Sequence, residues 1–221
     1  MTPEQQFLAA AAAGEQETLA AIVAANPEVV SAKDENGLSP VMLALYRGQQ
    51  TSAEWIAARC SSLNLHEAAA MGDADRVADL LAAHPEDADS YSSDGWTALH
   101  LAAFFDRPEA VTELVERGAH LQLPSRSDFA RGNTPLHAAI ANGARDAAAR
   151  LIALGADVNA RQSDGGFTPV HIAAFQSDPA SAEMLLAAGA DRSALNDKGQ
   201  TPFDVAMDNG NAAVAETLKA A

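Results

Sequence analysis

A short pattern recurs along the chain at a period of about 34 residues. Its clearest form is Thr-Pro-Leu-His at 134–137, with close versions at 97–100 and 168–171. The seven copies that we identify start at residues 5, 39, 63, 97, 134, 168 and 201. Such a period is typical of repeat proteins, in which one unit cannot bury its own apolar face and only a stack of units forms a core. We therefore predict a single domain over residues 1–221, with the first and last units as caps.

Each unit predicts two helices and a projecting turn. Threonine is a good N-cap and proline suits the first helical position, so Thr-Pro opens a short first helix. Second helices are expected over 147–154 in unit five and 182–188 in unit six, and Gly155 and Gly189 suit the left-handed turn that follows each. Alanine, the strongest helix former, occupies 52 positions. The fold class is therefore all-α.

The units resemble the ankyrin repeat family. The resemblance rests on Thr134-Pro135-Leu136-His137 and on the tail Gly155-Ala156-Asp157-Val158-Asn159-Ala160, and it extends over residues 3–220. It implies a solenoid of stacked helix-turn-helix units, with short β-hairpin fingers along one edge. It also implies that a partner protein binds the concave surface made by the fingers and the inner helices.

Two units depart from the regular length. Unit two has only 24 residues, so we expect its finger to be missing and the row of fingers to show a gap or a kink. Unit four has 37 residues, and its finger over 120–131 is longer than the others. This finger is either a tolerated surface insertion or a contact loop built around Phe129.

Charge and composition narrow the classes of partner. The chain has 30 Asp and Glu against 14 Lys and Arg, which gives a net charge of −16. Nucleic acids and anionic membrane surfaces would be repelled, whereas a basic protein partner would be favoured. No apolar run approaches the roughly 20 residues that span a bilayer, and the N-terminus has no secretory pattern. We expect a cytoplasmic, monomeric protein, and the excess of alanine and arginine indicates a bacterial genome.

Histidine and cysteine do not form a catalytic or metal-binding pattern. Four of the six histidines stand at 66, 100, 137 and 171, the same position of each unit. We interpret them as structural residues that bond to the backbone and to the adjoining unit, since copies one unit apart cannot share a metal ion. Cys60 stands alone and is expected to be a small apolar residue, with a reactive thiol as the alternative. We expect no catalytic residues, no metal and no cofactor.

Aromatic residues gather at the positions that the ankyrin resemblance places on the concave surface, namely the seventh and eighth residues after the threonine and the residue before it. The partner-binding candidates are Tyr46, Arg47, Met71, Trp96, Phe104, Phe105, Phe167, Phe175 and Gln176, with Arg126, Phe129 and Arg131 on the long finger. Trp96 and Phe167 could instead pack between fingers and helices. Aromatic side chains concentrated on one surface are typical of an interaction site.

The sequence therefore predicts a non-catalytic binding module that holds a partner protein in its concave groove, as an adaptor, an inhibitor or a chaperone. Two alternatives stay open. The same aromatic surface could serve self-association in a structural protein, and an enzyme or small-ligand binder would need a site that the motifs do not reveal.

Overall fold

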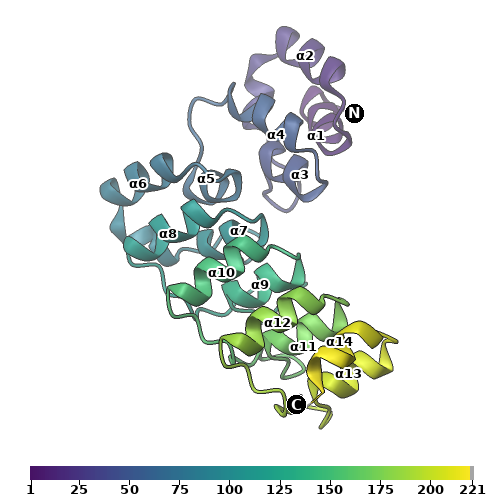
Figure 1. Cartoon of the computed structure of the whole chain (residues 1–221). Coiled ribbons are helices and arrows are strands. Elements are labelled where there is room, and N and C mark those ends of the chain that lie inside the picture. Colours follow the sequence, from purple (N-terminus) through teal and green to yellow (C-terminus); the bar gives the residue numbers. More distant parts are fainter. Residues whose placement is uncertain (220–221) are drawn as a thin grey trace.

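The computed structural model describes residues 1–219 and is a single stack of helix pairs (Figure 1). The inner helix of each unit is, in order, α1 (Pro3–Ala13), α3 (Pro40–Tyr46), α5 (Leu65–Met71), α7 (Ala98–Phe104), α9 (Pro135–Ala141), α11 (Pro169–Phe175) and α13 (Pro202–Asp208). The outer helices are α2 (Gln16–Ala25), α4 (Gln50–Ala57), α6 (Ala74–Ala83), α8 (Pro108–Glu116), α10 (Arg145–Ala153), α12 (Pro179–Ala187) and α14 (Ala212–Leu218). Two 3-10 helices, Pro27–Ser31 and Pro85–Asp89, follow α2 and α6. The all-α solenoid expected from the repeats is confirmed.

The inner helices begin where the caps predict, with two exceptions. Ser39, Thr97, Thr134, Thr168 and Thr201 are all N-caps. In unit three, Leu63 has no side-chain oxygen, so the cap moves one residue on to Asn64, whose side chain accepts from the Glu67 amide at 3.0 Å. In unit one the helix begins earlier than the start assigned at residue 5, because Thr2 and Gln5 form a capping box ahead of it. The outer helices predicted over 147–154 and 182–188 begin two and three residues earlier, at Arg145 and Pro179.

The fingers have the shape of hairpins but contain almost no β-structure. Backbone bonds close their bases, such as Ser92 N–H to the Trp96 carbonyl at 2.8 Å and Gln162 N–H to the Phe167 carbonyl at 2.9 Å. The β-pairing found within residues 1–219 is one isolated bridge between Tyr91 and Thr97. The expectation of β-hairpins is corrected to this extent, since arms of a few residues are too short for a ladder.

The finger of unit two is missing, as its length predicts, and the stack turns at this junction. Residues 58–64 connect α4 directly to α5, and Figure 1 shows this connection running outside the stack. On the outer side a pocket of about 540 Å³ opens between the end of α4 and the start of α6, with Ala57 and Arg76 among its lining residues. An open wedge thus separates the outer helices α4 and α6.

On the finger side the row closes instead of leaving a gap, which corrects one of the two expectations for this junction. The turn at Gly37 lies against Ser93, so that a Cβ built on Gly37 would lie 3.2 Å from the Ser93 side chain. The fingers of units one and three therefore meet directly, and a cavity of about 170 Å³ remains behind them. A missing finger has produced a kink that brings unit two towards unit four.

The buried apolar residues form two clusters, which meet at the junction between units two and three. The larger cluster of buried apolar residues extends from Leu65 in α5 to Leu218 in α14. A second cluster fills units one and two, from Phe7 to Ile56, and reaches across the junction to Trp96 and Leu101. Since two cores meet at the kink, the side chains that connect them determine how units two and four sit together.

Candidate functional site

The structure brings four of the sequence-predicted aromatic residues into one cluster, which we call the aromatic cluster: Tyr46, Trp96, Phe104 and Phe105. The ring centroids of Tyr46 and Phe105 are 5.4 Å apart, those of Phe104 and Phe105 are 5.1 Å apart, and those of Trp96 and Phe104 are 6.0 Å apart. Tyr46 ends α3, Trp96 ends the finger of unit three, Phe104 ends α7 and Phe105 follows it directly. The cluster therefore joins unit two to unit four, with the finger of unit three packed against it.

This cluster is less open to solvent than its pattern predicts. Trp96 is only 9% exposed, and Tyr46, Phe104 and Phe105 are half-buried. The Tyr46 hydroxyl donates to Asp94 Oδ2 at 2.6 Å. Burial, together with the charge of Asp94, raises the pKa of Tyr46 far above its ordinary value, so the phenol stays neutral. Trp96 thus packs inside the molecule, which was the alternative given for it from the sequence. The three half-buried rings offer only part of their surface to a partner.

The half-buried rings form one wall of a pocket of about 500 Å³ on the inner surface of the stack. Leu45, Tyr46, Gly48 and Gln50 line it from unit two, Phe104 to Arg107 from unit four, and Asn142 to Ala144 from unit five. Arg107 donates from Nε to the Ala70 carbonyl at 3.0 Å and from one terminal nitrogen to Gln50 Oε1 at 2.8 Å. The guanidinium therefore lines the pocket and links unit four to units two and three.

The long finger presents the most exposed large apolar side chain of residues 1–219. Phe129 is 100% exposed at its tip, and the neighbouring Arg131 pairs with Asp128 at 2.7 Å. The base of the finger is ordered, because the Arg126 guanidinium lies 3.9 Å from the centre of the Tyr91 ring and the Arg126 amide donates to the Gly95 carbonyl at 2.8 Å. Arg126 is thus committed to contacts within the chain, whereas Phe129 is open to a partner.

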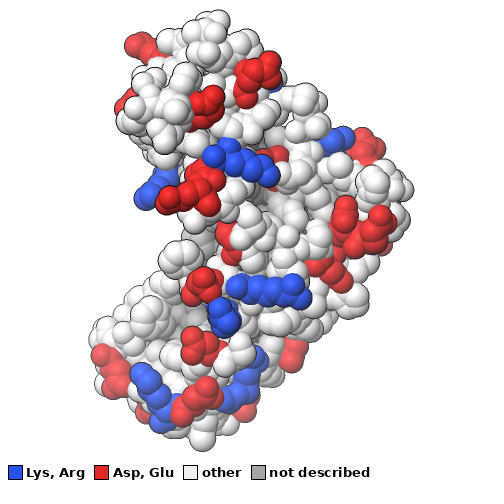
Figure 2. Space-filling model, turned by 180° about the vertical axis from the view of Figure 1, so that it is seen from behind, with Lys and Arg blue, Asp and Glu red and all other residues white. Residues whose placement is uncertain are grey.

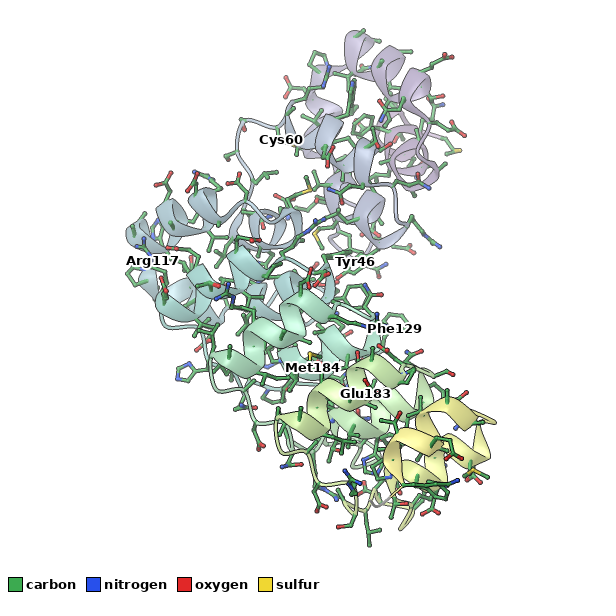
Figure 3. The ribbon with its side chains drawn as sticks, viewed as in Figure 1. Tyr46, Cys60, Arg117, Phe129, Glu183 and Met184 are labelled. Atoms are coloured by element: carbon green, nitrogen blue, oxygen red, sulfur yellow. The ribbon has the colours of Figure 1, made fainter. Side chains whose placement is uncertain are left out.

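Phe129 lies on the hollow side of the molecule. Figure 3 shows Tyr46 and Phe129 on one side of the stack and Arg117 on the opposite side. Figure 2 shows the molecule hollowed along that side, with acidic and basic side chains mixed there, while a patch of acidic side chains stands on the opposite edge. We use the term hollow side for the surface that the fingers and inner-helix ends form.

In the C-terminal half, some of the predicted binding residues pack within the stack and others are exposed to solvent. Phe167 is half-buried against the ring of His171, and the Gln176 amide donates to the Ala141 carbonyl of the preceding unit at 3.0 Å. Phe175 is 55% exposed on the inner helix α11. Met207 on α13 is 56% exposed and was missed, because it stands one residue before the position that we read for each unit.

The remaining candidates lie near the kink. Arg47 is exposed directly after α3, and Met71 is half-buried at the end of α5, where it also lines the outer wedge. Cys60 is half-buried in the connection, and burial raises the pKa of its thiol. A raised pKa lowers the thiolate fraction, so this thiol matches the apolar interpretation and not the reactive one.

The repeated histidines are structural. In His100, Nδ1 lies 2.7 Å from the hydroxyl of its own cap Thr97, and Nε2 lies 2.8 Å from the Asn133 carbonyl of the next finger. His137 and His171 repeat this arrangement with Phe167 and Gln200. His66 instead bonds the Ser90 carbonyl at 2.9 Å, because the cap of its helix has shifted. Within residues 1–219, His, Cys, Asp and Glu side chains form no group of three that could hold a metal ion.

None of the helices in the described part of the chain is long and apolar enough to cross a bilayer.

Comparison with known proteins identifies the repeats directly. A family model described as ankyrin repeats in three copies matches residues 65–162, and a second model of ankyrin repeats in many copies matches residues 145–186. Units one and two, before the kink, lie outside both matches.

The curated relatives share only part of their length with this chain. The tyrosine-protein kinase Shark of Drosophila melanogaster is 33% identical over 154 residues, which are 70% of this chain and 16% of the kinase. The neurogenic locus notch homolog protein 4 of Homo sapiens is 46% identical over 81 residues, which are 36% of this chain and 4% of that protein. The protein phosphatase 1 regulatory subunit 27 of Mus musculus is 39% identical over 94 residues, which are 42% of this chain and 58% of the subunit. These relatives are eukaryotic, and the bacterial origin indicated by composition stays a prediction.

Proposed function

Because this chain belongs to the ankyrin repeat family, whose repeats generally mediate protein–protein interaction, we propose that it holds a partner protein against its hollow side. In this proposal the chain catalyses no reaction on the partner. The kinase shares only 16% of its length with the chain, and a phosphodiesterase relative from Schizosaccharomyces pombe shares only 8%. The activities in their names are therefore no guide to this chain.

The observation that carries the proposal is the fully exposed Phe129 on a finger with an ordered base. A phenylalanine held out to solvent stabilises nothing in the free protein, whereas it can bury roughly 150–250 Å² against a partner. Phe175 and Met207 extend the exposed apolar surface over the later units. Interfaces depend on a few such anchors in the middle of a larger contact.

Charge supports a basic partner. The net charge of −16 gives a negative field around the whole molecule. Such a field accelerates encounter with a positively charged protein at low salt and contributes little once docking is complete. The proposal further places the chain in the cytoplasm as a monomer.

A capture experiment with a matched control tests this function. The intact protein, a Phe129→Ser/Phe175→Ser variant and an Arg117→Ser variant serve as baits for cytosol, and captured proteins are identified by mass spectrometry. Arg117 is the control because it is exposed on the opposite side of the stack (Figure 3) and pairs only with Glu113. Serine at these exposed positions leaves the fold intact, whereas serine at Phe104 and Phe105 would also disrupt the aromatic cluster.

We expect a protein captured by the intact and Arg117→Ser baits but lost from the double variant. With that partner purified, its affinity should fall at least about tenfold for each phenylalanine removed. Equal capture by all three baits contradicts the assignment of the hollow side. Sedimentation at several concentrations separates self-association, which the double variant would also abolish, from binding of a different protein.

A further inference from the structure

The pocket of about 500 Å³ beside the aromatic cluster exists because of the kink. Its walls come from units two, four and five, and unit three, which lies between two and four in the chain, contributes no lining residue. The reason lies in α5, where Ala70 and Met71 occupy the positions that Phe104 and Phe105 hold in α7. The small side chain and the missing finger let Tyr46 reach the phenylalanines directly.

The lining has a specific chemical character. Three aromatic rings line it together with the Arg107 guanidinium, which forms no ion pair with a carboxylate anywhere in residues 1–219. Asp106 also lines the pocket, and its Oδ1 accepts from the Ala147 amide at 2.8 Å. Gly48 and Gly143 leave their part of the pocket free, since a Cβ built on either would meet no atom within 4 Å. The pocket therefore has aromatic walls, one cation, one carboxylate that already accepts a backbone hydrogen bond, and open space between them.

We propose that this pocket is the anchor site for a single aromatic side chain of the partner protein. The assignment rests on the proposed function and specifies where and by what chemistry the partner is held. Unit two contributes to the site although it does not adjoin unit four in the chain, so the site differs from the surface that any pair of neighbouring units presents.

The lining favours an aromatic occupant over an aliphatic or a cationic one. An inserted ring continues the array of edge and tilted contacts among Tyr46, Phe104 and Phe105, and it stacks on the planar guanidinium of Arg107. An aliphatic side chain gains neither of these contacts. A lysine or arginine would bring a second cation beside Arg107, and the Asp106 carboxylate that could offset it already accepts the Ala147 amide. The volume lies within the range of about 300–1,000 Å³ typical of ligand pockets, so the backbone beside the anchor also has room.

Three small probes on the full chain test the assignment. N-acetyl-L-tryptophanamide, N-acetyl-L-leucinamide and N-acetyl-L-lysinamide are titrated separately, and backbone amide shifts are followed by NMR. We expect saturable shifts with the tryptophan probe at the amides of Gly48, Phe105 and Gly143. The leucine and lysine probes should bind at least five times more weakly.

Two glycines provide a matched pair of variants. Gly143 and Gly210 each stand nine residues after the cap threonine, with φ of 67° and 70° and no atom near a built Cβ. Asparagine tolerates this left-handed conformation, so Gly143→Asn obstructs the pocket while Gly210→Asn makes the same change in unit seven. Binding of the tryptophan probe should weaken at least fivefold in Gly143→Asn and stay unchanged in Gly210→Asn.

Each outcome decides between the two proposals. An absent response to the tryptophan probe, equal binding of the leucine probe, or equal binding to both asparagine variants overturns the anchor site. None of these results affects capture of a partner by Phe129 and Phe175. Conversely, a tryptophan probe that binds as expected while the Phe129→Ser/Phe175→Ser bait still captures its partner supports the pocket and contradicts the wider assignment of the hollow side.

Discussion

At the residue scale, single histidines tie an inner helix to the end of the finger that leads into the next unit. Burial lowers the pKa of His100 and of His137 to about 4, whereas an unfolded chain titrates near 6.5. Below pH 6.5 the unfolded state therefore binds more protons than the folded state, so stability is complete above that pH and declines as the pH falls towards 4. We expect the free energy of unfolding in urea to decrease by about 1.4 kcal/mol per pH unit for each of these two histidines.

One variant identifies the source of this slope. His137→Gln removes one titrating group and should make the slope shallower, although the loss of its bonds lowers stability at neutral pH. An unchanged slope in His137→Gln would assign the pH dependence to other groups.

At the scale of elements, contacts between adjacent fingers contribute to the free energy of unfolding. Gly95 has a φ of +82°, and a Cβ on it would lie 2.5 Å from the Ser127 amide nitrogen. Gly199 occupies the equivalent turn with a φ of +74° and has open space around it. We expect Gly199→Ala to cost about 1–2 kcal/mol from the backbone conformation alone, and Gly95→Ala to cost clearly more because the next finger must move. Urea unfolding of both variants measures the difference, and equal losses would show that the fingers do not support one another.

At the scale of the whole molecule, the two buried clusters predict two separate unfolding steps. Units one and two share a buried cluster around Phe7, and units three to seven share another around Leu151. Because solenoids unfold by neighbouring groups of units, we expect units one and two to open first, in a separate step seen by hydrogen exchange. Phe7→Ala should lower the stability of that step by about 3–5 kcal/mol, whereas Leu151→Ala should act on the later step. A single step shifted equally by both variants would contradict this division.

The repeat pattern predicted most of the fold, since Thr-Pro caps and left-handed glycines act through neighbouring residues. It also predicted the missing finger from the 24-residue unit. It failed at Leu63, where a cap needs an oxygen that leucine lacks, and at Thr2, whose capping box lies before the assigned start of the pattern.

The candidate site was predicted less well. Tyr46, Phe104 and Phe105 stay predicted binding residues, and their mutual burial depends on the angle at the kink, which no local pattern specifies. The pocket beside them was missed for the same reason. Phe129 could be recognised because a finger tip exposes its side chain whatever the angle between units.

The contact between units two and four has a consequence for modularity. In an ordinary solenoid each repeat touches only its neighbours, so repeats can be duplicated, deleted or exchanged one at a time. Here Gln50 bonds Arg107, and the Tyr46 ring contacts the Phe105 ring, across an intervening unit. Removal or duplication of unit three would break both contacts, so units two to four must be inherited, or transplanted by an engineer, together.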